Sequence, residues 1–423
     1  MSPVRTGRRD RDAADLALDD RMMKAALITA ARGAGRTHPN PSVGAVVFCG
    51  DQILGRGTTR PPGGPHAEIV AMDRAAKRHG ASALRGASLA VTLEPCSFQG
   101  RTGPCSDAII AAGITRVVAG CRDPHPRVAG RGFRKLRAAG ISVTTGVQVD
   151  ACREQHRGFL SVCERGRPWV TLKLAATLDG RIATASGESK WITGPASRAL
   201  VHRLRDAHDA VMVGSETALV DDPALTVRRG NRVVRTPIRV LIDGRLRVPA
   251  SAKLLSDGEA ERTWVVCAAG ARGVRAARAA AGRVIEVPRG EGGHVDLADA
   301  MLQLAGAGLT MLLLEGGGGL AAAMLRADLV DEVHWMLAPK LIGGDGREAL
   351  GPLSLNRLAE AISLERIQTT RQGEDIHVRG IVKRSAQISV KSARRKSSAT
   401  SSPASPSTRS RVARKGRKRK SAS

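Results

Sequence analysis

The chain has 423 residues, 42% of them hydrophobic, so it is long enough for two ordinary domains that each bury a core. Its formal net charge of +28 is typical of nucleic-acid-binding proteins, but twelve Lys and Arg residues and no Asp or Glu lie within Ala386–Ser423 alone. Aromatic residues make up 2% of the chain, which counts against the stacking platforms of proteins that bind single-stranded nucleic acid.

The first part of the chain alternates between helix and strand patterns. Residues 1–19 are polar and charged, and we expect a disordered leader there. Apolar residues at helical spacing predict a helix over Asp20–Ala34. The expected strands that follow are Val43–Phe48, Ser88–Leu93, Val117–Gly120 and Ile141–Val147, and the expected helices are His66–Lys77, Cys105–Ala112 and Gly132–Ala139. This alternation predicts a three-layer α/β/α domain with a mainly parallel sheet over residues 20–165.

A second α/β domain is predicted over residues 168–384, after the Arg-, Gly- and Pro-rich stretch Glu164–Pro168. Its expected strands are Trp169–Leu174, Ala210–Val213, Ile238–Ile242, Thr263–Cys267, Thr310–Leu314 and Ile376–Val382, and its expected helices are Pro195–Asp206 and Leu297–Ala305. Four glycines, Gly316–Gly319, follow an apolar strand and precede an Ala-rich helix. Backbone amides in such a turn can bind phosphate, although a glycine run can equally be a plain turn.

The last segment, residues 385–423, consists largely of Ser, Ala, Arg and Lys. Such a composition cannot bury enough apolar surface to fold, so we expect a disordered basic tail. The seven cysteines, together with the lack of an apolar signal-peptide core and of any run of about 18 apolar residues, predict a reduced, cytoplasmic protein without a membrane segment.

His66, Cys96 and Cys105 are candidate ligands of a zinc ion, and three such ligands leave the fourth position for water. Zinc lowers the pKa of that water, so hydroxide becomes available to attack a ring carbon. Glu68 lies two residues after His66, where its carboxylate can move a proton to the leaving amine. Zinc nucleobase deaminases share this general signature, but their cysteines are usually two residues apart, whereas eight intervene here. A structural zinc site and ordinary core residues are the alternatives.

Three motifs resemble the deaminase half of the bifunctional riboflavin-biosynthesis deaminase/reductase family. They are Thr37–Gly44, His66–Glu68 and Leu93–Cys105. In that family the longer insert between the cysteines is the usual form, so the spacing supports the resemblance. The resemblance implies that Asn40 contacts the substrate ring, although capping a turn between Pro39 and Pro41 is an alternative role. Family members often carry His where this chain has Phe98 and Gln99.

Further motifs are similar to the reductase half of the same family. They are Lys173–Arg181, Ser186–Thr193, Asp221–Arg228 and Ala338–Lys340, together with Glu315 and its glycines. The resemblance implies a dihydrofolate-reductase-like fold that uses NADPH. It places substrate contacts at Ser189, Arg205, Leu225, Arg228 and Glu315. It places cofactor contacts at Ala175, Trp191, Thr217, Asp221, Gly317, Gly318 and Gly319.

Several of these side chains have a physical reason to take the implied role. Arg205 and Arg228 can clamp a ribose phosphate through their planar guanidinium groups. Trp191 offers a flat face to a cofactor, although core packing is the alternative. Lys173 is a further candidate for contact with cofactor or substrate, and a solvated strand end is its alternative.

These interpretations predict one enzyme that catalyses two steps of riboflavin synthesis. The first is the zinc-dependent hydrolytic deamination of 2,5-diamino-6-(5-phosphoribosylamino)pyrimidin-4-one. The second is the NADPH-dependent reduction of the ribosyl side chain of 5-amino-6-(5-phosphoribosylamino)uracil to ribityl. We expect small-molecule substrates and a homo-oligomer. The alternative is a nucleic-acid-editing zinc deaminase anchored by the basic tail, which leaves residues 168–384 unexplained.

Overall fold

The computed structural model describes residues 6–100 and 103–384. The first of two large sheets has five strands in the order β2-β1-β3-β4-β5. The strands are β1 (Gly44–Cys49), β2 (Gln52–Thr58), β3 (Ser88–Leu93), β4 (Arg116–Cys121) and β5 (Ser142–Thr145). β3, β4 and β5 are parallel, whereas β1 is antiparallel to β2 and to β3. The sheet is therefore mixed, not mainly parallel as expected, because the short turn at Gly50–Asp51 makes β1 and β2 a hairpin.

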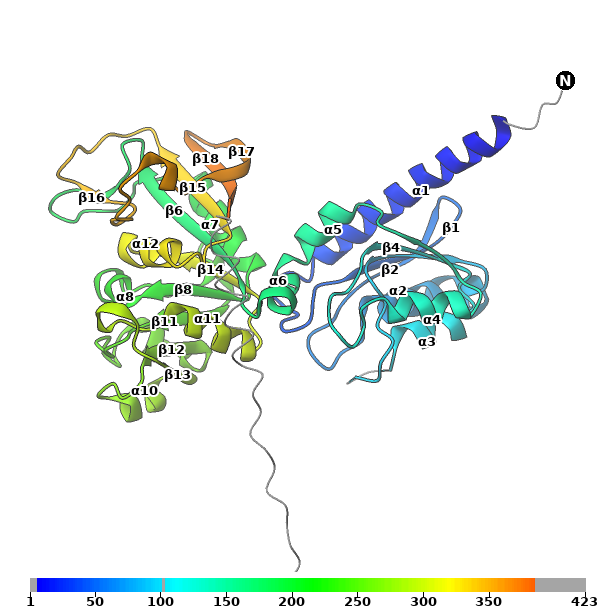
Figure 1. Cartoon of the computed structure of the whole chain (residues 1–423), viewed down its shortest axis with the longest axis horizontal. Helices are drawn as coiled ribbons and strands as arrows, with labels where there is room; N and C mark the ends of the chain where they lie inside the picture. The colour runs from blue at the N-terminus through cyan, green and yellow to red at the C-terminus, as the bar shows by residue number, and fades with distance from the viewer. Residues whose placement is uncertain (1–5, 101–102, 385–423) are drawn as a thin grey trace, which may run out of the picture. The chain divides into compact units, whose positions relative to one another are not determined.

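Helices cover both faces of this sheet, which confirms the three-layer arrangement (Figure 1). One face carries α1 (Thr6–Ala31) and α5 (Val149–Gln155), and the other carries α2 (Ala67–His79), α3 (Cys105–Ala111) and α4 (Arg131–Ala138). A further helix, α6 (Arg157–Arg165), follows α5 and was not expected. The core between the layers is apolar, with Phe48, Leu89 and Leu136 fully buried.

The first helix begins at Thr6, so residues 6–19 are helical where a disordered leader was expected. Its last part is held by a tertiary contact that local composition does not reveal. Asp19 is buried, and its carboxylate accepts a hydrogen bond from Arg116 Nη2 on β4 at 2.7 Å. Residues 1–5 of the expected leader lie outside the described residues.

The second large sheet has nine strands in the order β13-β12-β11-β8-β14-β6-β15-β18-β17. The strands are β6 (Trp169–Thr177), β8 (Ala210–Gly214), β11 (Ile238–Ile242), β12 (Thr263–Ala268), β13 (Arg283–Val287), β14 (Met311–Glu315), β15 (Glu332–Ala338), β17 (Leu364–Gln372) and β18 (Asp375–Val382). The strands from β13 to β15 are parallel, and only β18 and β17 run antiparallel to their neighbours. All six strands predicted for this part of the chain are present.

Six helices and two small ribbons complete the second α/β part. The helices are α7 (Pro195–Ala207), α8 (Ser215–Asp221), α9 (Lys253–Ser256), α10 (Val274–Ala280), α11 (Leu297–Gly306) and α12 (Gly318–Arg326). The ribbons pair β7 (Arg181–Ala183) with β16 (Arg347–Glu348), and β9 (Val227–Arg229) with β10 (Arg232–Arg235). Apolar side chains lie on both faces of the sheet, and Leu312, Leu313 and Leu314 of central strand β14 are fully buried.

The two sheets have separate hydrophobic cores, and residues 166–168 connect α6 to β6. α6 ends at Arg165 and β6 begins at Trp169, and the domain boundaries at 165 and 168 stay predictions. Among the residues described, no helix is long and apolar enough to cross a membrane. The expected basic tail, residues 385–423, lies outside them.

Candidate active sites

The three predicted zinc ligands lie together at the carboxyl end of β3, the central strand of the first sheet. His66 directly precedes α2, Cys96 follows β3, and Cys105 is the first residue of α3. Their ligand atoms all lie within 4.8 Å of one another, and no other group of this kind occurs in the described parts of the chain. His66 Nδ1 is 3.2 Å from Cys105 Sγ and 3.6 Å from Cys96 Sγ. One imidazole and two thiols in this arrangement suit zinc, with a position left for water.

The cluster also favours a thiolate, the form in which cysteine binds a metal. Hydrogen bonds from Cys105, together with one from His66, lower the pKa of the Cys96 thiol to about 4. The backbone N–H of Cys105 donates one of these bonds to Cys96 Sγ at 3.3 Å. The pKa of Cys105 is raised, because its thiol shares a hydrogen bond with Cys96 and is buried.

Glu68 lies in the first turn of α2, beside the ligands, and its side chain is buried. Burial raises the pKa of Glu68 to about 7, and the nearby Cys96 thiolate adds to this effect. A carboxyl group with a pKa near neutrality can both accept and deliver a proton. The position of Glu68 therefore fits the predicted proton transfer.

Asn40 and Phe98 have contacts that bear on their predicted roles. Asn40 forms a turn in which its backbone N–H donates to the Thr37 carbonyl at 2.9 Å, and the Thr37 hydroxyl donates to the Asn40 carbonyl at 3.0 Å. These are backbone contacts, so contact of the Asn40 side chain with a substrate ring stays a prediction. Phe98 contacts two other side chains: the Arg127 guanidinium is 4.0 Å from its ring centroid, and the His125 ring is stacked at 6.2 Å.

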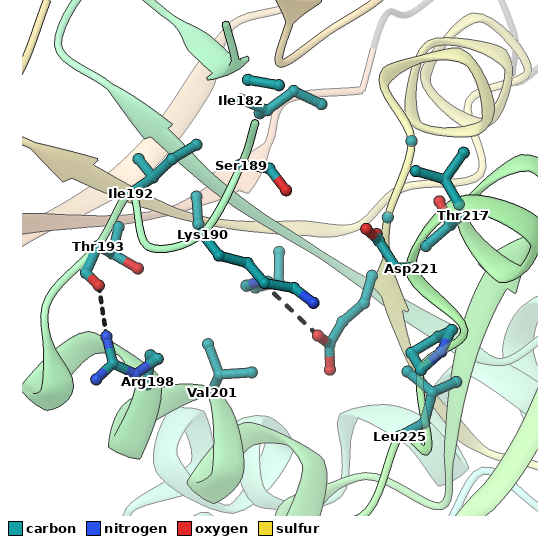
Figure 2. Close-up of a pocket in the computed structure, with 18 of the residues that line it drawn as sticks. Ile182, Ser189, Lys190, Ile192, Thr193, Arg198, Val201, Thr217, Asp221 and Leu225 are labelled. Atoms are coloured by element: carbon teal, nitrogen blue, oxygen red, sulfur yellow. Dashed lines mark hydrogen bonds and ion pairs between the residues drawn. The ribbon is translucent and has the colours of Figure 1, made fainter. Parts of the chain in front are cut away.

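The second α/β part contains a cavity of about 870 Å³. All twelve predicted reductase residues line it: Ala175, Ser189, Trp191, Arg205, Thr217, Asp221, Leu225, Arg228, Glu315, Gly317, Gly318 and Gly319. Figure 2 shows Ser189 on one side of this cavity, with Thr217, Asp221 and Leu225 on the other. The structure thus brings together positions from Ala175 to Gly319 that are far apart in the sequence, although their individual roles stay predictions.

Three charged side chains of the cavity lining, from α7, β14 and β6, lie next to one another. Arg205 of α7 pairs with Glu315 at the end of β14 through two contacts, Nε–Oε1 at 2.6 Å and Nη2–Oε2 at 3.0 Å. Lys173 of β6 adds a third charge, with its Nζ 3.7 Å from Glu315 Oε2. Burial by itself raises the pKa of Glu315, but the charge and hydrogen bonds of Arg205 outweigh it and hold that pKa at about 2. Burial lowers the pKa of Lys173.

The glycine turn connects β14 to α12 and borders the same cavity. Gly316 has a φ of +112°, and a Cβ added there would lie 2.7 Å from Thr217 Oγ1. A Cβ on Gly318 would lie 3.0 Å from the backbone nitrogen of Gly351. Close packing therefore requires glycine at both positions, and the positive φ is a second reason at Gly316.

Both halves of the chain match known family models. Residues 17–121 match the model described as "Cytidine and deoxycytidylate deaminase zinc-binding region", and residues 168–378 match "RibD C-terminal domain". The riboflavin biosynthesis protein RibD of Escherichia coli K12 is 41% identical over 372 residues, which cover 85% of this chain and 98% of that protein. The Aquifex aeolicus protein of the same name is 38% identical, over 85% of this chain and 97% of the relative. The chain belongs to the RibD family.

Solved structures of RibD proteins agree with this assignment. Acinetobacter baumannii RibD superposes with a TM-score of 0.77 at 35% identity, covering 87% of this chain and all of that one. The Thermotoga maritima diaminohydroxyphosphoribosylaminopyrimidine deaminase/5-amino-6-(5-phosphoribosylamino)uracil reductase superposes with a TM-score of 0.74 at 32% identity, with the same coverage. As a RibD protein, the chain is a bifunctional riboflavin-biosynthesis enzyme. It combines a zinc-binding, cytidine-deaminase-like domain with an NADPH-dependent, dihydrofolate-reductase-like domain.

Several side chains that line the RibD reductase cavity were not predicted from the sequence. They include Lys190, Arg198, His202, Arg347 and Glu348. Arg198 lies on an expected helix, but no helical spacing connects it to Trp191, which precedes that helix; in the structure its guanidinium is 4.6 Å from the Trp191 ring centroid. Arg347 had no signal in the sequence, because it reaches the cavity through the pairing of β16 with β7, more than 160 residues away in the chain.

Proposed function

We propose that this RibD protein deaminates 2,5-diamino-6-(5-phosphoribosylamino)pyrimidin-4-one and then reduces the ribosyl side chain of the deaminated product to ribityl. The observation that carries the proposal is the cluster of His66, Cys96 and Cys105 beside buried Glu68, in a chain that also builds the charged reductase cavity. The Thermotoga maritima relative, whose name states both activities, supports the same substrates.

In the deaminase domain, His66, Cys96 and Cys105 hold the zinc ion, and Glu68 handles the proton. Zinc, when bound, supplies a hydroxide at neutral pH for attack on the ring carbon that carries the amino group. Glu68 takes a proton from the attacking water and returns it to the amine, which leaves as ammonia. Its pKa of about 7 suits both transfers, since neither the charged nor the neutral carboxyl is strongly favoured.

In the reductase domain, the Lys173–Glu315–Arg205 group would bind the ribosyl end of the substrate through its ring oxygen and hydroxyl groups. NADPH supplies the hydride that the ribosyl carbon C1′ gains. Opening of the ribose ring also requires one proton on the ring oxygen, and the buried Lys173 ammonium is the donor that we assign to it. Glu315 stays ionised because its pKa is about 2, so it holds the Lys173 ammonium in place through charge.

Arg228 is better placed than Arg205 to bind the substrate phosphate. Arg205 already donates hydrogen bonds to Glu315 through Nε and Nη2, and its Nη1 donates to the Thr226 carbonyl at 2.9 Å. A second cavity of about 510 Å³ shares Arg198, His202, Arg228 and Asn231 with the first, and it is also lined by Arg203 and Arg229. Arginine side chains around this shared wall provide the charge-assisted donors that a phosphate monoester needs.

Self-association is part of the proposal. β17 is an edge strand of the nine-stranded sheet, and its residues Glu365–Arg371 are all exposed. Ile367 on this strand is 55% exposed. An open strand of this kind offers unpaired backbone groups to a second copy, so we propose a homo-oligomer that pairs through β17. Light scattering of the wild-type chain and of an Ile367→Lys variant tests this directly, since the charged variant should dissociate.

We also propose that the protein is cytoplasmic and that its basic tail takes no part in catalysis. None of the seven cysteines, all of which lie in the described parts of the chain, forms a disulfide, which supports a reducing, cytoplasmic environment. The basic tail lies beyond residue 378, where the match to the RibD C-terminal domain ends, so we assign no part of either reaction to it.

The test is direct. The purified chain is loaded with zinc, supplied with the diaminopyrimidine substrate and NADPH, and the products are identified by mass spectrometry. Release of one ammonia and oxidation of one NADPH for each ring supports the proposal. Failure to release ammonia contradicts the first step, and failure to oxidise NADPH on the supplied intermediate contradicts the second.

A further inference from the structure

Glu94 is a buried carboxylate two residues before the zinc ligand Cys96, and neither proposed reaction uses it. Its side chain is 4% exposed, and its two oxygens accept four backbone N–H hydrogen bonds. The donors are Asp123, Gly130, Gly132 and Phe133, at 3.3, 2.9, 3.0 and 3.4 Å. Hydrogen bonds of this kind to an ionised carboxylate are stronger than those between neutral groups.

The four donors all belong to one segment that follows β4. Two lie in the β4–α4 loop (residues 122–130), and two lie in the first turn of α4. A carboxylate at this end of a helix satisfies N–H groups that have no partner within the helix, and it also interacts favourably with the helix dipole. A single side chain therefore fixes both the loop and the start of the helix that follows it.

The same segment is packed directly on the chain between Glu94 and Cys96. A Cβ added to Gly132 would lie 2.0 Å from the carbonyl oxygen of Pro95 and 3.2 Å from Glu94 Oε1. Only glycine permits this approach, because any other residue would push α4 away from Pro95. The hydrogen bonds of Glu94 and the absence of a side chain at Gly132 both allow the start of α4 to pack against Pro95.

The tip of the β4–α4 loop meets the chain on the other side of Cys96. The Arg127 guanidinium is 4.0 Å from the centroid of the Phe98 ring, and its Nη2 donates to the Gln99 carbonyl at 3.4 Å. The His125 ring is stacked on Phe98 with an angle of 23° between the planes. The loop therefore touches the chain before and after the metal ligand.

We propose that Glu94 is a positioning residue for deamination. It holds the β4–α4 loop against residues 95–99, and through that loop it keeps His125 and Arg127 stacked on Phe98 beside the zinc ligands. This inference rests on the proposed deaminase function. It explains why a buried charge lies at this position: four backbone donors converge there, and a neutral side chain of the same shape cannot accept from all of them.

Two variants disturb the same contact by different chemistry. Glu94→Gln replaces one acceptor oxygen with an NH₂ group, which cannot accept a hydrogen bond, and Gly132→Ala inserts a methyl group against Pro95. Each should lower deaminase kcat/KM by about 10- to 100-fold, the range typical of groups that orient a metal site from outside its ligands. The larger part of the loss should appear in KM, with one zinc ion per chain retained and the reductase activity of the same chain unchanged.

The matched control is Asp107→Asn. It removes the other carboxylate that reaches α4, through an exposed ion pair with Lys135 at 2.5 Å, and it should leave deamination unchanged. The Glu94→Gln/Gly132→Ala double variant should be no worse than the poorer single variant, because both changes displace one loop.

Three results would overturn the inference: wild-type kinetics of Glu94→Gln, loss of zinc from that variant, or effects of the two changes that multiply. If Glu94→Gln does not fold, as judged by circular dichroism, Gly132→Ala supplies the same kinetic test, and wild-type kinetics of that variant would overturn the inference. A wild-type chain that cannot deaminate would instead contradict the proposed function.

Discussion

The Arg205 guanidinium and the Glu315 carboxylate form a two-pronged ion pair inside the reductase cavity, with N···O distances of 2.6 and 3.0 Å. Both side chains are largely buried, so the pair contributes to stability, and both also line the cavity in which we expect the substrate to bind. Two distant elements, α7 and β14, are joined by it, and Lys173 of β6 is held at its side.

Arg205→Ala should destabilise the reductase domain strongly, because it leaves the buried Glu315 carboxylate without its main partner. Loss of one partner from a buried pair typically costs about 3–5 kcal/mol in the free energy of unfolding. Urea unfolding of the wild-type and variant proteins measures the difference. The matched control is Arg278→Ala, which breaks an exposed pair with Glu286 and should cost at most about 1 kcal/mol. Equal losses for the two variants would contradict this view of the Arg205–Glu315 pair.

The same pair predicts how stability depends on pH. Glu315 has a pKa of about 2 in the folded protein and an ordinary value of 4.5, so the unfolded chain binds the proton more readily. The stabilisation from Glu315 is therefore fully present above about pH 4.5 and is lost as the pH falls toward 2. Unfolding measured across this range should show a smaller acid effect in Glu315→Gln than in the wild-type protein.

Reductase activity should fall on the alkaline side as Lys173 loses its proton. Burial lowers the pKa of Lys173 from the usual value of about 10.4, so the loss should begin at a lower pH than for an exposed lysine. Steady-state rates from about pH 6 to about pH 10, all below the usual lysine pKa of about 10.4, test this with NADPH oxidation as the signal. Lys173→Met should abolish reduction while deamination continues. A rate that stays level throughout would exclude Lys173 as the proton donor.

Glu68→Gln should abolish deamination and leave the reduction of supplied intermediate unchanged. The amide keeps the shape of Glu68 but cannot transfer the proton. Loss of one general acid–base group typically costs about 10²- to 10⁴-fold in rate, and here the same group serves both transfers, so the upper part of that range is expected. Ammonia release measures the first activity and NADPH oxidation the second. Loss of both activities in this variant would mean that the two sites do not act independently.

Removal of the basic tail after residue 384 should change neither activity. The tail carries twelve Lys and Arg residues between Ala386 and Ser423, and the match to the RibD C-terminal domain ends before it, at residue 378. If the tail contacts nucleic acid, the full chain should bind duplex DNA with an affinity that falls steeply with salt, and the truncated chain should not. Loss of turnover on truncation would contradict the division of the chain that we propose.

The zinc cluster could be predicted from the sequence because one His and two Cys residues, with Glu68 two residues after the His, form the general signature of zinc nucleobase deaminases. In the structure His66 directly precedes α2, Cys105 begins α3 and Cys96 follows β3. The contacts of Glu94 could not be predicted, since its four donors come from a loop whose path depends on the tertiary structure. The type of residue at position 94 carries no signal of this role.

Strand β2 was missed for a related reason. Its sequence contains Gly55 and Gly57, which weaken a strand pattern. In the fold these glycines permit α2 to approach closely: a Cβ on Gly55 would lie 2.2 Å from the Ala71 carbonyl oxygen, and one on Gly57 would lie 2.1 Å from that of Ala67. The glycines that obscured the strand are thus the ones that position the helix bearing Glu68.

Removal of the metal should separate the activities of the two active sites that we propose for consecutive steps in one chain. The zinc-loaded chain is treated with a chelator and assayed with each substrate in turn. We predict that ammonia release from the diaminopyrimidine stops and returns when zinc is restored, while NADPH oxidation on the deaminated intermediate continues at its original rate throughout. Continued deamination by protein shown to be free of metal, or an absence of NADPH oxidation before and after treatment, would contradict it.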